Sequence, residues 1–271
     1  MSHQTVIVLD FGGQYNQLIA RRVRECGVYC EVKPYTTPLD QIRAMNPIGI
    51  IFTGGPNSVY DPKSPQVDPA IFTWGVPILG ICYGCQLMAH NLGGRVTEAQ
   101  DDSAREYGKT ETYFDSACKL FKGLPAQGIT WMSHGDYMEK VPEGFALVAH
   151  SDACPNVAIC DESRGFYGVQ YHPEVNHTEH GTDMIRNFLY EVCGAAGAVE
   201  AAGGACRAGG RRSAVRIDAV QAAQRHKRQS MLAGIVHHRS VIVAVQGQTV
   251  PHPCKDSSRE HRVRSGNRQF C

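Results

Sequence analysis

The fold is indicated most clearly by residues 76–86, which read VPILGICYGCQ. The residues before Cys82 form a short apolar run of the kind that is typical of a buried strand. Gly80 and Gly84 lie on either side of the cysteine. Small flanking residues let a strand turn sharply into a helix and hold the residue at the turn in a strained backbone conformation. The segment therefore predicts a strand, a tight turn at Cys82 and a following helix.

Strand and helix signals alternate around this segment. Such an order predicts a mostly parallel sheet with helices on both faces, a three-layer α/β arrangement of the flavodoxin-like kind. The apolar and amphipathic patterns place strands at 6–9, 30–32, 48–52 and 77–81, and helices at 16–24, 38–45 and 86–92.

The pattern changes from residue 95 onward, where short strand-like runs are separated by turns. This predicts antiparallel strands joined to the parallel sheet. We expect an amphipathic helix over 182–192 to close the region. The expected strands are 95–98, 108–114, 129–132, 145–150, 157–160 and 166–171.

A second segment, GVQYHPE at residues 168–174, ends a predicted strand in a histidine and a carboxylate. A thiol becomes a good nucleophile when a base activates it and a third group orients the base. Cys82, His172 and Glu174 supply these three groups, which favours attack on a carbonyl-like carbon. The alternatives are a buried cysteine in a tight turn and a histidine that only caps a strand.

Backbone donors for a developing oxyanion are expected beside Cys82. The glycines of the segment TGGP at residues 53–56 end a neighbouring strand and let a backbone N–H approach closely. The N–H of Tyr83, directly after the cysteine, is the second expected donor. The dipole of that helix favours a thiolate at its N-terminus.

The spacing of cysteines and histidines does not favour metal or redox chemistry. Cys82 and Cys85 have C-x-x-C spacing, and His177 and His180 have H-x-x-H spacing, but no further ligands follow at useful positions. We therefore predict no metal site. The N-terminus lacks the features of a signal peptide, and no stretch is long and apolar enough to cross a bilayer. The eleven scattered cysteines are expected to be reduced thiols of a cytoplasmic protein without a membrane partner.

The motifs resemble those of class I glutamine amidotransferases and, more narrowly, the glutaminase domain of the GMP synthase family. The resemblance covers about residues 5–194. It rests on the cysteine and His-Pro-Glu motifs and on the segments LDFGGQY (9–15), IARRVRE (19–25), GVYCE (27–31), TGGP (53–56), REYG (105–108), WMSHGD (131–136) and HPEVNHT (172–178).

This resemblance implies a substrate and individual roles. Cys82 attacks the side-chain amide of glutamine, His172 transfers the proton to departing ammonia and Glu174 orients His172. The N–H groups of Gly55 and Tyr83 hold the oxyanion. The positions implied to lie near the backbone of the bound glutamine are Gln86, Ser133, His134 and Asp136, of which Asp136 pairs with the substrate ammonium group.

The resemblance also implies a partner. In the family, ammonia passes to an ATP-pyrophosphatase domain that uses ATP and Mg²⁺ to activate xanthosine 5′-monophosphate (XMP), and amination gives GMP. The glutaminase domain itself needs no cofactor. No phosphate-binding loop of that second domain is recognisable in this sequence, so we expect the synthetase half to be absent. Two alternatives stay open: a catalytically idle domain that keeps the fold, and a stand-alone glutaminase subunit.

Residues 195–271 differ in character from the rest. They hold 13 of the 27 Lys and Arg residues but only 4 of the 26 Asp and Glu residues, and their one aromatic side chain is Phe270. Too little apolar surface is available for a second core. We expect a disordered or non-native tail, such as a frameshift or truncation produces. A nucleic-acid-binding tail is the weaker alternative, because stacking aromatic side chains are lacking.

Overall fold

The computed structural model describes residues 4–98 and 106–196 of the chain. The predicted tail lies outside these residues except for its first two positions, and so does Arg105 of the quoted motifs. Those predictions therefore stay predictions.

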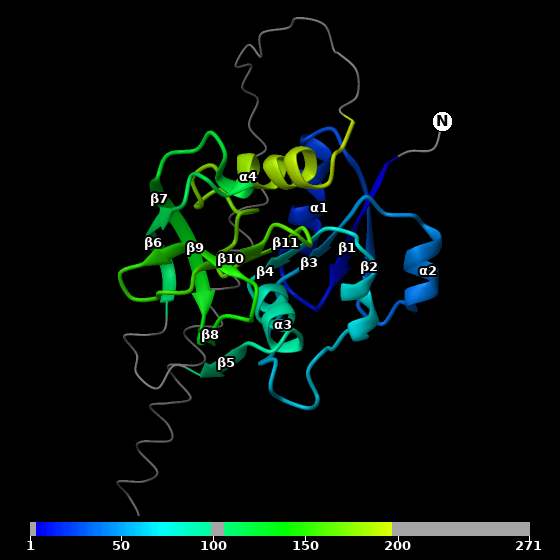
Figure 1. Cartoon of the computed structure of the whole chain (residues 1–271), viewed down its shortest axis with the longest axis horizontal. Coiled ribbons are helices and arrows are strands. Elements are labelled where there is room, and N and C mark those ends of the chain that lie inside the picture. Colours follow the sequence, from blue (N-terminus) through cyan, green and yellow to red (C-terminus); the bar gives the residue numbers. More distant parts are fainter. Residues whose placement is uncertain (1–3, 99–105, 197–271) are drawn as a thin grey trace, which may run out of the picture. The chain divides into compact units, whose positions relative to one another are not determined.

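A nine-stranded sheet forms the centre of the described region (Figure 1). Its strand order is β2-β1-β3-β4-β11-β10-β9-β6-β7. The pairs β1·β2, β1·β3, β3·β4 and β4·β11 are parallel, as the alternating strand and helix signals predicted. The bounds of this part are β1 (Thr5–Asp10), α1 (Asn16–Glu25), β2 (Tyr29–Pro34), α2 (Leu39–Ala44), β3 (Gly49–Phe52), η1 (Pro69–Thr73), β4 (Ile78–Ile81), α3 (Tyr83–Asn91) and β11 (Phe166–Val169).

The other half of the sheet is antiparallel, which confirms the second expectation. Strand β10 pairs with β11 and β9, and β6 pairs with β9 and β7. Strands β5 and β8 form a separate two-stranded sheet. The bounds are β5 (Arg95–Glu98), β6 (Glu106–Phe114), η3 (Lys119–Phe121), β7 (Gln127–His134), β8 (Asp136–Lys140), β9 (Ala146–Ser151), β10 (Ala158–Asp161), α4 (Gly181–Asn187) and η4 (Phe188–Val192).

Helices cover both faces of the sheet, so the three-layer α/β fold is confirmed. Alternate residues of a strand point to opposite faces. Val6 and Val8 of β1 pack with α1 and α4, whereas Ile7 and Leu9 pack with α2 and α3. Each face therefore has its own apolar core.

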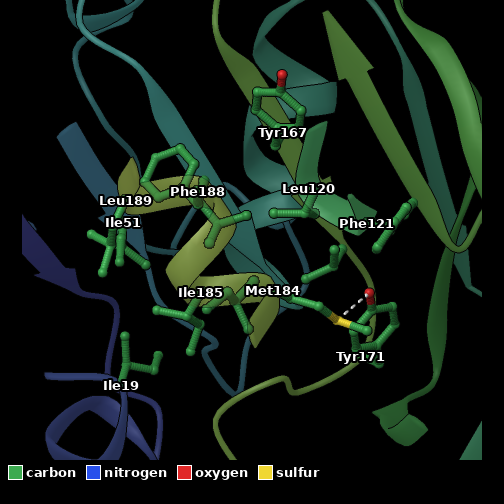
Figure 2. Packing of buried hydrophobic residues seen from close by; sticks show 14 of the residues in the cluster. Ile19, Ile51, Leu120, Phe121, Tyr167, Tyr171, Met184, Ile185, Phe188 and Leu189 are labelled. Atoms are coloured by element: carbon green, nitrogen blue, oxygen red, sulfur yellow. Dashed lines mark hydrogen bonds between the residues drawn. The ribbon is translucent and has the colours of Figure 1, made fainter. Parts of the chain in front are cut away.

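The core beneath α4 and η4 joins segments that are distant in the sequence. Figure 2 shows Met184, Ile185, Phe188 and Leu189 packed near Leu120 of η3, with the Tyr171 hydroxyl 3.2 Å from the Met184 sulfur. The sequence predicted one helix over 182–192. The structure instead has a π-helical turn from Phe188 to Val192, which keeps both Phe188 and Leu189 fully buried.

Two further differences from the expectation concern elements that carry predicted site residues. Helix α3 begins at Tyr83 and not at Gln86, because Cys82 already serves as its N-terminal cap residue. Strand β8 was not predicted, since its sequence DYMEK is short and polar at most positions. Within residues 4–98 and 106–196, no helix has the length and apolar character that crossing a membrane requires.

Candidate active site

Cys82 lies at the turn between β4 and α3 in a backbone conformation that few side chains adopt. Its φ is 52° and its ψ is −110°. The glycines beside it are required by close packing: a Cβ on Gly80 would lie 2.6 Å from the Gly84 carbonyl oxygen, and one on Gly84 would lie 2.5 Å from the Phe52 carbonyl oxygen. The predicted tight turn is therefore present, and neighbouring backbone holds it.

The sheet brings His172 to Cys82. The Cys82 N–H donates to the carbonyl of Val169 at the end of β11 (2.8 Å), so the turn is tied to the strand that leads to His172. Both side chains also border Gly54. A Cβ built there would lie 3.2 Å from His172 Cε1 and 3.7 Å from Cys82 Cβ. The thiol and the imidazole thus share one small space at the carboxyl ends of β3, β4 and β11.

Glu174 contacts the far side of the imidazole. The distance from His172 Nδ1 to Glu174 Oε1 is 2.8 Å, and the Glu174 side chain is fully buried. Burial by itself lowers the pKa of His172. Negative charge on Glu174 and on Cys82, with their hydrogen bonds, outweighs that effect and raises the pKa of His172 well above its ordinary value of 6.5. The site therefore favours the protonated form of the His172 imidazole.

The segment after β11 is fastened to β7. The hydroxyl of Thr178 donates to the His172 carbonyl (2.6 Å) and accepts from the Trp131 N–H (2.9 Å). The His172 N–H donates to the Trp131 carbonyl (3.0 Å). From the other side, Arg22 of α1 donates to the Glu174 carbonyl (2.9 Å). These bonds fix the backbone at both ends of the His172–Glu174 pair.

Of the two predicted oxyanion donors, Tyr83 directly follows Cys82 and Gly55 packs against the ring of Tyr83. Tyr83 is the first residue of α3, where backbone N–H groups have no partner within the helix. Gly55 is confined between the Phe11 carbonyl oxygen and the ring of Tyr83, which would lie 2.9 Å and 3.2 Å from an added Cβ. Only glycine fits there without displacing backbone or ring.

Gln170 is a polar residue near the site that the sequence analysis missed. Its side chain is fully buried, and its Nε2 lies 3.9 Å from the sulfur of Cys82. Its Oε1 accepts a hydrogen bond from Gln86 Nε2 (3.1 Å). The signal in the sequence is a single amide side chain within the apolar run from Phe166 to Tyr171.

The other residues predicted near the substrate have different surroundings. Gln86 is buried and also donates to the Asp136 carbonyl (2.9 Å), while the Asp136 carboxylate accepts from the Tyr60 hydroxyl (3.1 Å). Ser133 is exposed and His134 is buried at the end of β7. Successive side chains of a strand point to opposite faces, so the side chains of Ser133 and His134 lie on opposite faces of β7.

In the described part of the chain, the residues with C-x-x-C and H-x-x-H spacing belong to no cluster of three metal-ligating groups. Cys85 is fully buried in α3, and burial raises the pKa of its thiol. The ring of His177 packs against Trp131 at 4.6 Å between centroids. His180 precedes α4 and lies 3.5 Å from Asp183.

Comparisons with known proteins identify the family of the chain. Residues 7–192 match the family model "Glutamine amidotransferase class-I". The chain is 60% identical over 189 residues to "GMP synthase [glutamine-hydrolyzing]" of Clostridium perfringens, covering 70% of this chain and 36% of the relative. It is 58% identical over 197 residues to the enzyme of the same name from Caldicellulosiruptor saccharolyticus, covering 73% and 38%. The chain therefore spans a little over a third of the length of these curated relatives.

A solved structure extends the comparison to the fold. A protein of Thermoplasma acidophilum, described as a putative GMP synthase subunit, aligns with a TM-score of 0.64 and 29% identity, over 72% of this chain and 96% of that one. The resemblance predicted from the motifs is thus confirmed. The chain belongs to the class I glutamine amidotransferase family, and its matched region is similar to the corresponding part of GMP synthases.

Proposed function

We propose that the chain hydrolyses the side-chain amide of glutamine by covalent catalysis at Cys82. One observation carries the proposal: Cys82 lies at a strained strand-to-helix turn next to an imidazole that a fully buried carboxylate holds at 2.8 Å. A thiolate beside an imidazolium at a helix N-terminus is a strong nucleophile. The raised pKa of His172 supports the same pairing.

The proposed reaction has two steps. The Cys82 sulfur attacks the amide carbon, and the N–H groups of Gly55 and Tyr83 stabilise the oxyanion. His172 gives its proton to the leaving nitrogen, so ammonia departs and a γ-glutamyl thioester remains. The same imidazole then takes a proton from water, which attacks the thioester and releases glutamate and the thiolate. Glu174 stabilises the imidazolium and fixes its orientation.

Recognition of the substrate backbone is proposed to involve Gln86, Ser133, His134 and Asp136. The amide nitrogen of Gln86 already has two acceptors in the protein, so its oxygen is the atom left to meet a donor on the substrate. The Asp136 carboxylate is partly exposed and negatively charged, which suits the ammonium group of an amino acid.

We further propose that the ammonia serves amination of XMP to GMP by an ATP-pyrophosphatase domain or subunit that uses ATP and Mg²⁺. The names of the curated relatives support this role. One specific observation favours a synthetase partner on a separate chain: the Thermoplasma protein, which is described as one subunit of its enzyme, is aligned over 96% of its length.

The experiment is a glutamate-release assay on the full chain and on Cys82→Ala, with Cys26→Ala as a control at another buried thiol. We expect Cys82→Ala to lose release and Cys26→Ala to keep it. Mass spectrometry of the chain mixed with glutamine should detect a thioester on Cys82 even where turnover is slow. Release that persists in Cys82→Ala would contradict the proposal. Absence of both release and adduct in the unmodified chain would favour the idle domain.

A further inference from the structure

A second group of reactive side chains lies outside the candidate active site. Cys118 and Cys160 are both buried free thiols. Together with Glu162 they form the one set of three His, Cys, Asp or Glu side chains within residues 4–98 and 106–196 whose ligand atoms converge, all within 4.8 Å of one another. None of the three takes part in the proposed hydrolysis.

The backbone around these side chains is well supported. Cys160 belongs to β10, which is hydrogen-bonded to β9 and β11 on its two sides, and Glu162 follows directly after that strand. Cys118 immediately precedes η3, whose Leu120 is buried in the core that Figure 2 shows. The Asn187 side chain donates to the carbonyl of Leu120 (3.0 Å), which fastens η3 to α4. Both halves of the group are thus held before any ligand arrives.

We propose that Cys118, Cys160 and Glu162 bind a thiophilic divalent cation of the zinc class. Two thiolates and one carboxylate are donors that Zn²⁺ accepts, with bonds of about 2.3 Å to sulfur and about 2.0–2.2 Å to oxygen. Tetrahedral bonds of these lengths place the donors somewhat less than 4 Å apart. Shifts of about 1 Å or less bring the present atoms to such separations. Water completes the coordination, and the two thiols lose their protons on binding.

Lys119 supplies both a support and a competitor for this site. Its backbone N–H donates to Glu162 Oε1 (3.1 Å) and orients the carboxylate, as outer-sphere partners of metal ligands do. Its ammonium group lies 3.8 Å from Glu162 Oε2 and is a positive charge that a cation must displace. Both side chains are more than a third exposed, so the lysine can swing away and leave a path for the ion. We therefore expect that removing the charge of Lys119 strengthens metal binding.

The experiment uses the full chain with Cys82→Ala, which removes the candidate nucleophile. Zn²⁺ is titrated in competition with a coloured chelator, and Co²⁺ binding is followed by absorbance. We expect the site to bind one equivalent of metal, and the thiolate-to-cobalt charge-transfer band to have the intensity of two thiolate ligands. Cys118→Ser and Cys160→Ser should each weaken binding at least about 100-fold and remove half of that band, and Glu162→Gln should weaken it about tenfold. Lys119→Met should tighten binding several-fold. Lys122→Met, which removes a nearby cation paired with Glu191, should change nothing.

Three results would overturn the proposal. Equal zinc affinity in Cys118→Ser, Cys160→Ser and a Cys154→Ser control would mean that zinc binds thiols adventitiously. Equal affinity in Lys119→Met and Lys122→Met would place the ion elsewhere; these two exposed substitutions test the site even if a cysteine variant fails to fold. Peptide mapping is done on protein kept in reducing buffer. A disulfide between Cys118 and Cys160 under these conditions would mean that the pair is a redox couple and not a metal site.

Discussion

Cys82 has a positive φ, a region in which a side chain costs on the order of 1–3 kcal/mol, and such strain is retained where the surrounding structure enforces it. The turn is enforced by the Cys82–Val169 hydrogen bond and by the packing of Gly80 and Gly84. The turn places Cys82, which is buried, at the end of β4. A substitution that removes the Cβ should therefore recover stability at the cost of the nucleophile.

We predict that Cys82→Gly is at least as stable as Cys82→Ala in urea unfolding, although glycine ordinarily costs about 1 kcal/mol more than alanine near a helix. The reason is that glycine adopts this φ without strain. Ala89→Gly, at a buried position of the same α3, should show the ordinary loss. A Cys82→Gly variant that is less stable than Cys82→Ala by the ordinary amount would mean that the turn is not strained.

The His172–Glu174 pair predicts a specific pH dependence. Because the folded pKa of His172 is raised above 6.5, the protonated His172 stabilises the fold most below that pH, and the contribution is lost as the pH rises through the folded pKa. The difference in unfolding free energy between the native chain and Glu174→Gln should shrink along that rise. An NMR titration of His172 should show a lower pKa in Glu174→Gln. Asp183→Asn, beside the exposed His180, is the control and should leave the profile of His172 unchanged.

At the scale of elements, α3 packs directly against the end of β3 because Gly84 has no side chain. A methyl group at Gly84 would meet the backbone and Cβ of Phe52 at 2.5–2.8 Å, and none of these atoms is the end of a flexible side chain. We predict that Gly84→Ala destabilises the fold by roughly 1–3 kcal/mol and moves Cys82 enough to reduce glutamate release. Gly128→Ala in β7 has its first contact at 3.3 Å with the Glu179 carboxylate, the end of an exposed side chain, and should cost much less. Comparable losses in both variants would remove the special role of this junction.

The elements also show what sequence patterns can and cannot predict. Apolar runs located the strands of the large sheet, because burial of β1, β3, β4 and β11 on both faces requires them. The pattern missed β8, which lies in a two-stranded sheet with β5 and buries Met138 alone of its residues. It also missed the π-helical turn of η4. An α-helix with 3.6 residues per turn and a slightly wider helix space apolar side chains almost equally over a few residues, so the pattern does not distinguish them.

The candidate site also contains residues that the sequence predicted and residues that it missed. The motifs predicted Cys82, His172 and Glu174 together, because each chemical role requires a particular residue type. Gln170 was missed because a buried amide looks like any polar interruption of a strand until its partners are known. Cys118 and Cys160 were missed because their proximity depends on where η3 meets β10, and sequence spacing carries no information about that meeting.

At the scale of the whole described region, the candidate site joins the two halves of the sheet. Cys82 comes from the parallel half, whereas the segment that carries His172 is fastened to β7 at the antiparallel edge through Thr178 and Trp131. The relative position of thiol and imidazole therefore depends on contacts with a strand that contributes neither group. A displacement of about 1 Å in such a site can cost about 100-fold in rate.

Thr178→Val removes this connection and keeps the shape of the side chain. The change leaves the Trp131 N–H and the His172 carbonyl each without one partner, so we expect a loss of about 1–3 kcal/mol in unfolding free energy. It should also reduce kcat for glutamate release about 10- to 100-fold, with a smaller change in KM, because the imidazole and not the substrate pocket loses its support. Thr112→Val is the matched control: it breaks the buried Thr112–Thr130 hydroxyl pair (2.8 Å) within the same antiparallel half and should cost stability while kcat stays near the native value. Equal losses of kcat in the two variants would show that activity follows overall stability, and that β7 does not position the candidate base.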